Sequence, residues 1–359
     1  MNTDIVLNPL GYPLIVADNN FSTINQLLNK EAESGCTFFI LVDENTYQHC
    51  ISQLLTNIEA LAQAEIIEIE SGEENKTIEI CTHLWEALTE NGADRRSVMI
   101  NLGGGVITDM GGFVSATYKR GIRFYNIPTT LLSQVDASTG SKTGVDLGGL
   151  KNQIGVFADP QAVFINPAFL KTLPSNQIQS GYGEILKHAL IADKEYWNAI
   201  KGKHYTEIED WGALILPSLR IKSEIVEQDP TEKGLRKLLN FGHTIGHALE
   251  TFALENNHPL LHGQAVALGM LAEAWLSTQL TTLSADQFEE IKEVILYNFE
   301  LYKPSEANFE RLLELMGHDK KNISGQVRLT LLNEIGKGVY DIKCDPKLLK
   351  DALRFLTSI

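Results

Sequence analysis

The sequence lacks the features that mark membrane and secreted proteins. No apolar stretch reaches the ~18 residues needed to cross a bilayer, and residues 1–17 carry neither the basic start nor the long apolar run of a signal peptide. The four cysteines (Cys36, Cys50, Cys81 and Cys344) have no CxxC spacing, so neither a zinc knuckle nor a disulfide framework is indicated. We therefore expect a cytoplasmic protein with no membrane partner.

Basic side chains are scarce relative to acidic ones. The 359 residues include 30 Lys and Arg against 46 Asp and Glu, which gives a formal net charge of −16. This balance excludes a general electrostatic attraction to nucleic acid, so we expect no nucleic-acid partner. An anionic ligand must instead meet a local cluster of basic residues.

Short apolar runs alternate with helical spacing up to Pro174. The runs expected to be buried strands are residues 37–42, 66–69, 98–102, 124–127 and 162–165. This alternation predicts an α/β domain with a mainly parallel sheet over residues 1–174. Helical spacing then dominates, which predicts a mostly α-helical domain over residues 175–359. Its expected elements are helices at 178–193, 211–228, 244–253, 263–280, 284–297 and from 346, and a strand at 327–332.

The segment Gly103-Gly104-Gly105 follows an expected strand and opens an expected helix. Such a turn brings bare backbone N–H groups against a phosphate. It departs from the GxGxxG fingerprint because Thr108 replaces the third glycine, so a purely structural turn is the alternative. Asp109 favours the ligand-binding interpretation, since its carboxylate is placed to accept hydrogen bonds from a nucleotide.

Residues 120–152 are rich in groups that bind anions. The basic and hydrogen-bonding members are Arg120, Thr129, Thr130, Ser133, Ser138, Thr139, Lys142, Lys151 and Asn152. Glycines at 140, 144, 148 and 149 indicate irregular backbone. A solvated polar loop is the alternative, but apolar residues punctuate the segment and acidic residues are few, so we expect a ligand site.

Three later segments offer metal ligands. His243 and His247 are four residues apart and share one helical face, a spacing that zinc sites use. Taken without further knowledge, the site comprises His243, His247 and either Glu184 or His262. His188 lies four residues after Glu184, so composition alone does not choose the set. Nearby basic residues (Lys187, Lys222 and Arg236) predict a second anion-binding wall.

The chain closely resembles the 3-dehydroquinate synthase family over nearly its whole length. The segments that carry the resemblance are, in order, GGGVITDMGGFVSATYKRG, IPTTLLSQVDASTGSKTGVD, GLKNQIG, FLKTLP, GYGEILKH, EKGLRKLLNFGHTIGHALE, HGQAVALGM and DKKN. The resemblance implies a homodimeric enzyme of the shikimate pathway, with an N-terminal NAD-binding domain and a C-terminal metal-binding domain.

The resemblance also implies a role for each site residue. Glu184, His243 and His262 bind Zn²⁺, with Co²⁺ as a substitute, and His247 is left as a base or hydrogen-bond partner. NAD is held by Asp43, Asn45, Glu73, Lys76, Gly104, Gly105, Asp109, Thr129, Thr130, Lys151, Phe169 and Thr172. The catalytic set is Lys142, Asn152, Lys187 and His247. The substrate is bound by Arg120, Asp136, Lys222, Arg236, Asn240 and one of Lys320 and Lys321.

The implied substrate is a phosphorylated sugar acid, 3-deoxy-D-arabino-heptulosonate 7-phosphate. Oxidation of its C5 hydroxyl by NAD acidifies the neighbouring C–H, so that phosphate leaves by β-elimination. Return of the same hydride leaves NAD unconsumed. Ring opening and an intramolecular aldol closure then give 3-dehydroquinate.

The chain departs from the family pattern at two positions. Ser141 replaces a common glycine, and Gln264 replaces a glutamate beside His262, which removes a negative charge expected near the metal.

Three other functions are the alternatives. They are another sugar-phosphate cyclase, of the 2-epi-5-epi-valiolone or 2-deoxy-scyllo-inosose type, a metal-dependent polyol dehydrogenase, and a catalytically silent NAD-binding protein. Asn240 and His247 disfavour a valiolone-type cyclase, and the basic cluster disfavours the dehydrogenase.

Overall fold

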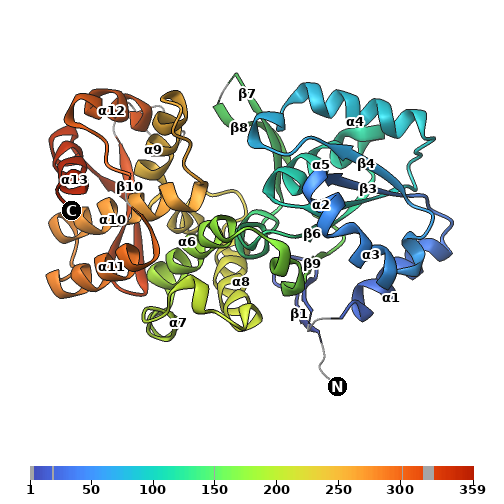
Figure 1. Cartoon of the computed structure of the whole chain (residues 1–359), viewed down its shortest axis with the longest axis horizontal. Helices are drawn as coiled ribbons and strands as arrows, with labels where there is room; N and C mark the ends of the chain where they lie inside the picture. Colours follow the sequence, from blue (N-terminus) through green and yellow to red (C-terminus); the bar gives the residue numbers. More distant parts are fainter. Residues whose placement is uncertain (1–3, 18–19, 149, 301, 318–326) are drawn as a thin grey trace. The chain divides into compact units, whose positions relative to one another are not determined.

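The protein consists of two compact units, Met1–Pro174 and Ser175–Ile359. The computed structural model describes residues 4–17, 20–148, 150–300, 302–317 and 327–359 (Figure 1). Lys320 and Lys321, which the sequence predicts as substrate-binding residues, lie outside the described residues.

The first unit contains a seven-stranded sheet in the order β1-β2-β9-β6-β5-β3-β4. All neighbouring strands are parallel except β1 and β2, which run antiparallel. The strands are β1 (Ile5–Leu7), β2 (Leu14–Val16), β3 (Phe38–Asp43), β4 (Glu65–Ile69), β5 (Val98–Gly103), β6 (Arg123–Pro128) and β9 (Val163–Ile165). The predicted α/β class and each of the expected strands are confirmed, and β1 and β2 are additional.

Helices cover both faces of this sheet, which is why its central strands are almost wholly apolar. Successive residues of β3 alternate between the two faces: Ile40 and Val42 pack with α1 and α3, and Phe39 and Leu41 pack with α4 and α5. The helices of this unit are α1 (Ser22–Glu33), α2 (Glu44–His49), α3 (Ile51–Asn57), α4 (Ile78–Glu90) and α5 (Gly105–Thr117).

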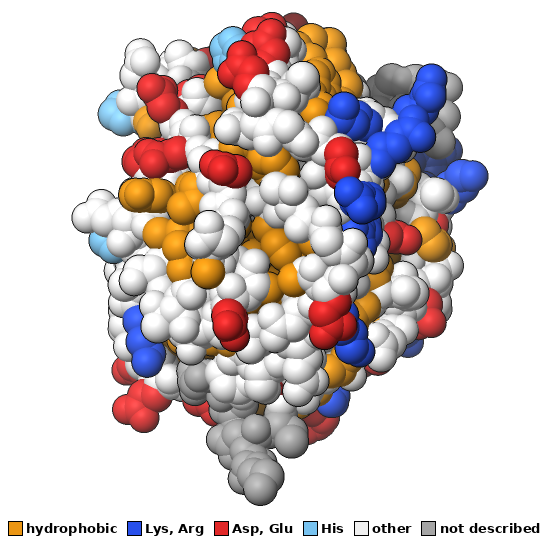
Figure 2. All heavy atoms as spheres, turned by 90° about the vertical axis from the view of Figure 1, so that its right-hand side faces the viewer, with side chains coloured by type: hydrophobic (Ala, Val, Ile, Leu, Met, Phe, Trp, Pro, Cys, Tyr) orange, Lys and Arg blue, Asp and Glu red, His pale blue; other side chains and the backbone are white. Residues whose placement is uncertain are grey.

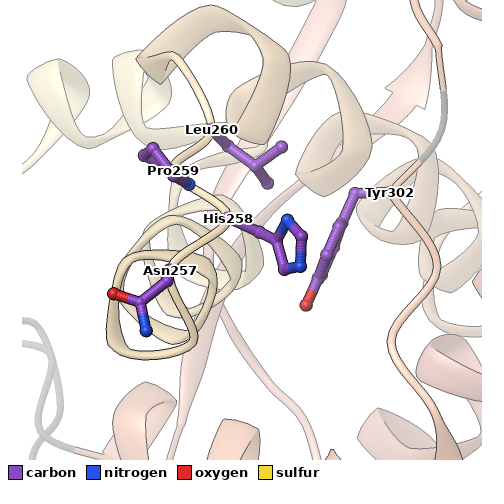
Figure 3. A pocket seen from close by; sticks show the side chains of 5 residues that line it. All are labelled: Asn257, His258, Pro259, Leu260 and Tyr302. Carbon is purple, nitrogen blue, oxygen red and sulfur yellow. The ribbon is translucent and has the colours of Figure 1, made fainter.

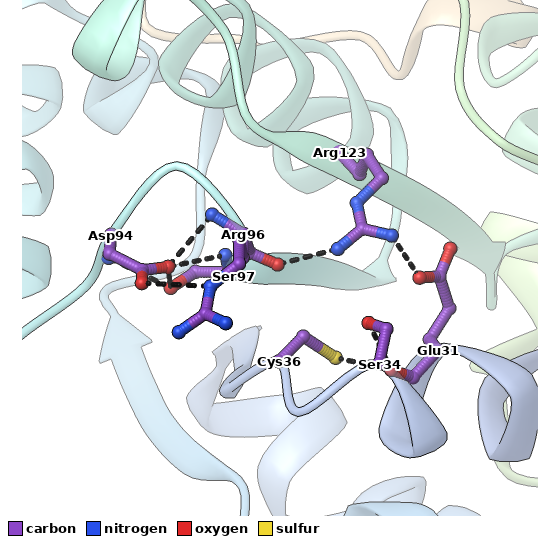
Figure 4. Close-up of polar contacts among 7 residues, drawn as sticks. All are labelled: Glu31, Ser34, Cys36, Asp94, Arg96, Ser97 and Arg123. Carbon is purple, nitrogen blue, oxygen red and sulfur yellow. Dashed lines mark hydrogen bonds and ion pairs between the residues drawn. The ribbon is translucent and has the colours of Figure 1, made fainter.

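A polar network ties α1 to the amino end of β6 (Figure 4). Arg123 forms an ion pair with Glu31 and donates to the carbonyl oxygen of Arg96 at 2.6 Å. The Tyr125 hydroxyl donates to the other Glu31 oxygen at 2.9 Å. Nearby, burial raises the pKa of the Cys36 thiol, and all four cysteines are unbridged. The contacts of Glu31 therefore fix α1 against β6.

On the face shown in Figure 2, acidic and apolar side chains are interspersed, whereas most Lys and Arg side chains gather along one border.

The segment expected to have irregular backbone forms a π-helical turn and a hairpin instead. The turn spans Ser133–Ala137, and β7 (Lys142–Leu147) pairs antiparallel with β8 (Leu150–Phe157). Gly144 and Gly155 face one another, and a Cβ at Gly155 would lie 2.2 Å from the carbonyl oxygen of Thr143. These glycines permit close strand approach, so their presence does not signal a loop.

The second unit is mostly helical, as predicted. Its helices are α6 (Ser175–Ala192), α7 (Lys194–Ile200), α8 (Trp211–Gln228), α9 (His243–Glu255), α10 (His262–Leu280), α11 (Ala285–Asn298), α12 (Phe309–Gly317) and α13 (Pro346–Ser358), with one hairpin of β10 (Arg328–Glu334) and β11 (Lys337–Lys343). Helix α10 is central and packs against α6, α9, α11 and α13. The expected helices and the strand at β10 are confirmed, whereas α7, α12 and β11 were not expected. No helix in the described part of the chain is long and apolar enough to cross a membrane.

Candidate active site

The predicted cofactor residues of the first unit gather at the carboxyl edge of its parallel sheet. Asp43 and Asn45 stand at the end of β3, and Gly104 and Gly105 follow β5. The strand order reverses between β3 and β5, and such a switch point is where open α/β sheets bind ligands. The remaining members follow other strands at the same edge: Glu73 and Lys76 after β4, Thr129 and Thr130 after β6, and Phe169 and Thr172 in the 3₁₀ segment after β9 (Pro167–Thr172).

The glycine turn fits a phosphate group. Helix α5 begins after Gly104 with no side-chain cap, so its first-turn N–H groups have no side-chain capping acceptor. A Cβ at Gly104 would lie 3.1 Å from Thr130 Cγ2, and one at Gly111 would lie 2.0 Å from Asn101 Oδ1. Close helix–sheet packing, the task of the third glycine in GxGxxG, is therefore performed by Gly111 and not at Thr108. The structure thus explains the departure from the fingerprint.

Lys76 joins the predicted cofactor residues to a predicted catalytic one. Its side chain is buried, and Nζ lies 2.6 Å from Asp109 Oδ2 and 2.7 Å from Asn152 Oδ1. Burial by itself lowers the pKa of Lys76, but the charges of Asp109 and Glu73 more than offset it and raise that pKa. Lys76 is therefore a cation held between two predicted ligand-binding side chains. Lys151 Nζ lies 3.9 Å from Glu73 Oε1 at the same edge.

Three further predicted residues of this unit lie on other segments of the chain. Asp136 lies in the π-helical turn, and Lys142 is exposed at the start of β7. Arg120 is exposed at the far end of α5, immediately before β6 begins. That position is the amino edge of the sheet, so the first unit does not bring Arg120 to the other site residues. Its substrate role stays a prediction.

The second unit brings the predicted metal ligands together. Glu184 Oε1 lies 3.5 Å from His243 Nε2 and 3.4 Å from His262 Nε2. One ring nitrogen from each of His243, His247 and His262 lies within 4.8 Å of those of the other two. Convergence of a carboxylate and imidazoles fits a zinc site, which takes nitrogen and oxygen ligands at about 2.0–2.2 Å. Geometry alone leaves both ligand sets of the sequence analysis open.

The electrostatic environment of this cluster favours a cation. Burial lowers the pKa of His262, but hydrogen bonding to Glu184 and Glu250 outweighs it and raises that pKa to about 10. Glu184 itself is fully buried on α6 and forms an ion pair with Lys187 one turn later. A divalent metal would replace the proton that the two carboxylates attract at His262.

Glycines next to the ligands let the helices approach closely enough for the cluster to form. Gly263 follows His262, and a Cβ there would lie 1.9 Å from the carbonyl oxygen of Ser180 on α6. The Gly263 N–H also donates to Ser180 Oγ at 2.9 Å, so α6 caps the start of α10. This contact holds His262 on α10 against the helix that carries Glu184.

We expect Gly263→Ala to destabilise the protein by about 1–3 kcal/mol, because overpacking against rigid backbone forces the helices apart. Metal affinity should fall as well, since His262 moves with α10. Denaturant unfolding measures the first effect. The matched control is Gly202→Ala, because a Cβ at Gly202 meets nothing within 4 Å. Equal stability of the Gly263→Ala variant and the wild type would contradict this account of the packing.

Buried cations and an ordered loop accompany the metal cluster. Lys187, Lys222 and Arg236 are all buried. The Asp229 carboxylate accepts hydrogen bonds from the backbone N–H groups of Lys233 (3.0 Å), Gly234 (2.6 Å) and Arg236 (3.1 Å). Burial raises the pKa of Asp229, but these bonds outweigh it and hold that pKa below its usual value. These hydrogen bonds therefore fix the backbone conformation of the loop over residues 229–236.

A carboxylate approaches His262 from another helix. Gln264 Oε1 accepts from the Leu261 N–H at 3.0 Å, so it closes the start of α10. The carboxylate beside His262 Nδ1 is Glu250, at 3.5 Å. A carboxylate of α9 therefore lies beside His262, and the effect of Gln264 on the metal stays a prediction. Asp229 and Glu250 were missed because nothing in a single sequence distinguishes them from surface acids.

Asn240 is also held in place before any ligand arrives. Its Nδ2 donates to Glu232 Oε1 at 2.6 Å. Glu232 has a left-handed backbone conformation with φ of 60°, within the loop that Asp229 organises. The second unit thus places Asn240 and Arg236 on one ordered segment.

His188, the alternative metal ligand next to Lys187, forms a hydrogen bond through Nδ1 with Ser218 Oγ of α8 at 2.6 Å.

Comparisons with known proteins agree with this arrangement. The family model described as 3-dehydroquinate synthase N-terminal matches residues 66–180, and the model described as 3-dehydroquinate synthase C-terminal matches residues 181–322. A 3-dehydroquinate synthase of Parabacteroides distasonis is 42% identical over 323 residues, covering 88% of each chain.

Two solved structures share the fold. A 2-deoxy-scyllo-inosose synthase, complexed with carbaglucose-6-phosphate, NAD⁺ and Co²⁺, has a TM-score of 0.84 at 22% identity and covers 98% of this chain and 99% of its own. A 2-epi-5-epi-valiolone synthase from Streptomyces hygroscopicus, with NAD⁺ and Zn²⁺ bound, has a TM-score of 0.82 at 24% identity and covers 100% and 99%. These likenesses support the fold, and the sequence matches go further: the chain belongs to the 3-dehydroquinate synthase family.

Proposed function

We propose that this chain is a 3-dehydroquinate synthase, which converts 3-deoxy-D-arabino-heptulosonate 7-phosphate to 3-dehydroquinate and phosphate in aromatic amino-acid biosynthesis. The observation that carries the proposal is the cluster of Glu184, His243, His247 and His262 beside buried Lys187. A metal site next to buried cations suits an anionic, oxygen-rich substrate. A polyol dehydrogenase would need the metal site but not the cations.

Residues 1–174 form the NAD-binding domain of this proposal. The uncapped start of α5 would hold the pyrophosphate through backbone N–H groups. Asp109, held by Lys76, is placed within the first turns of the same helix to accept hydrogen bonds from the nucleotide. The side chains at the ends of β3, β4, β6 and β9 complete the cofactor set. Bound NAD supplies reversible hydride transfer, so it is recycled within each turnover.

Residues 175–359 form the metal- and substrate-binding domain. Glu184, His243 and His262 would hold Zn²⁺, or Co²⁺ in its place, and a bound metal of this kind supplies Lewis-acid polarisation of a substrate oxygen. Three protein ligands are what catalytic zinc sites use, since a further position must stay open for the substrate. His247 is then available to hold or transfer a proton at a ring nitrogen.

The basic side chains bind and orient the anionic groups of the substrate. Lys187, Lys222 and Arg236 are buried, where a charge–charge interaction is stronger than at the surface. Arg236 presents a planar fork that suits phosphate or carboxylate oxygens. Lys142, Asn152, Asp136 and Asn240 complete the proposed substrate contacts. The dense positive charge raises the local concentration of an anion despite the net charge of −16.

A homodimer in the cytoplasm completes the proposal, on the strength of the family resemblance. The related cyclases are the second candidates, because two of them share the fold with TM-scores of 0.84 and 0.82. Their substrates differ from the heptulosonate phosphate in lacking a carboxylate. Substrate preference therefore separates the candidates.

The test is a phosphate-release assay with the heptulosonate phosphate, sedoheptulose 7-phosphate and glucose 6-phosphate in parallel, with product identification. We expect turnover of the heptulosonate phosphate alone. It should proceed on a trace of NAD without accumulation of NADH, because the hydride returns to the product. Preference for either other sugar phosphate would favour a related cyclase. Stoichiometric NADH production would instead indicate a dehydrogenase.

A further inference from the structure

Helix α10 carries a buried carboxylate that the proposed chemistry does not use. Glu273 is fully buried, on the helix that begins with His262. Its Oε2 accepts a hydrogen bond from the Gly242 N–H at 2.7 Å, and its Oε1 accepts one from the Ile245 N–H at 3.2 Å. The two backbone groups bracket His243, the first residue of α9.

Glu273 acts as a helix cap supplied from a neighbouring helix. The residue before α9 is Gly242, which has no side chain to cap the first-turn N–H groups. A carboxylate at this end of a helix is also favoured by the helix dipole. Glu273 therefore does for α9 what Ser180 of α6 does for α10. In both cases the capped helix begins with a proposed metal ligand.

The backbone before His243 is fitted closely to α10. Gly242 has a left-handed conformation with φ of 79°, and a Cβ there would lie 2.5 Å from Met270 Cγ. A Cβ at Gly269, one turn before Glu273, would lie 1.8 Å from the carbonyl oxygen of Gly242. The turn is therefore packed tightly against α10, and Glu273 holds it there with two hydrogen bonds.

The imidazole of His243 is oriented from the same turn. Its Nδ1 lies 3.1 Å from the carbonyl oxygen of Phe241, so this hydrogen bond assigns the proton to Nδ1. Nε2 is thereby left as the ligand atom that faces Glu184 Oε1. A displacement of the 241–245 backbone would move both the ring and the carbonyl group that orients it.

We propose that Glu273 is a positioning residue for the metal centre, which acts through the backbone on either side of His243. The inference rests on the proposed function, because it takes His243 to be a metal ligand. A buried carboxylate is costly unless hydrogen bonds compensate it. Here the two bonds to the α9 turn provide that compensation, and the geometry of His243 is the consequence.

The variant Glu273→Gln tests this directly. It keeps the volume and one acceptor oxygen but places an NH₂ group against one of the two N–H donors. We expect Zn²⁺ affinity, measured by competition with a chelator, to fall about ten- to a hundredfold, the range for residues that orient metal ligands. The visible absorption spectrum of the Co²⁺-loaded protein should change too, because it reports ligand geometry.

Glu290→Gln is the matched control. Glu290 of α11 also accepts hydrogen bonds within the second unit, from Trp197 Nε1 at 2.6 Å and Lys201 Nζ at 2.8 Å, and these partners lie on and directly after α7. This variant should keep wild-type metal affinity and the wild-type Co²⁺ spectrum. A general loss of stability would move neither readout in a folded protein.

The outcomes distinguish the role of Glu273 from the proposed ligand role of His243. Wild-type metal affinity and spectrum in folded Glu273→Gln would overturn the role of Glu273. Should that variant fail to fold, Glu273→Asp, which keeps both acceptor oxygens on a shorter arm, is judged by the same two measurements. Wild-type affinity in His243→Ala would instead show that the proposed ligand set is wrong.

Discussion

Replacing His262 by Ala should remove the divalent metal and lower kcat/KM by at least about a thousandfold. A Lewis acid supplies several kcal/mol of transition-state stabilisation, and each ~1.4 kcal/mol corresponds to a factor of ten. His262 Nε2 lies 3.4 Å from Glu184 Oε1, so its removal breaks the cluster at its centre. Elemental analysis after dialysis measures the metal, and phosphate release measures the activity.

Glu184→Ala should give the same loss of metal with a larger loss of stability. Glu184 is the ion-pair partner of fully buried Lys187, and removing one partner of a buried pair costs about 3–5 kcal/mol. The control for both variants is His83→Ala, at an exposed position on α4. Near-stoichiometric zinc with full activity in either Glu184→Ala or His262→Ala would refute the ligand assignment.

Alanine at Lys142, Lys187 or Arg236 should lower kcat/KM by at least about tenfold, which corresponds to only ~1.4 kcal/mol of lost transition-state stabilisation. Arg236 should be the most sensitive, because its guanidinium meets phosphate or carboxylate oxygens bidentately whereas a lysine does not. Its buried position on the loop that Asp229 organises agrees with this order. Steady-state kinetics with the heptulosonate phosphate provide the measurement.

The matched control for the lysines is Lys343→Ala, at an exposed position in β11. This variant should keep wild-type kinetics, because a solvated surface charge contributes little. The fold should survive the Lys142 and Arg236 changes, as circular dichroism can verify. Wild-type kinetics in all three variants at Lys142, Lys187 and Arg236 would mean that these side chains do not bind the substrate.

A pocket lies beside the loop that precedes α10 (Figure 3). It is lined by Asn257, His258, Pro259, Leu260 and Tyr302. Its side chains belong to the segment before His262 and to the segment after α11. The ring of His258 points toward Tyr302 in this view. His258 lies in the loop before α10, and we propose no part for it in the metal site.

The sequence by itself determined most of the strands and helices that surround the site, and it supplied the candidate site residues. Periodicity identified the strands β3, β4, β5, β6 and β9 and the helices α6, α8, α9, α10 and α11, because the side-chain repeat of a strand or helix is a property of consecutive residues. The motif segments, through the family they resemble, named Glu184, His243 and His262, and the fold places Glu184 Oε1 3.5 Å from His243 Nε2 and 3.4 Å from His262 Nε2.

Only the tertiary structure decided how those residues are supported. Glu273 contacts a turn that precedes it by 28 to 31 residues, and Glu250 approaches His262 from another helix. Close packing likewise assigned Gly111, Gly144 and Gly263 to helix and strand contacts. Such contacts depend on how separate elements pack, and no spacing within one element records them. The sequence signal for Glu273 was an acidic residue within an apolar helical run. A buried carboxylate needs hydrogen-bond donors, but the sequence does not identify them.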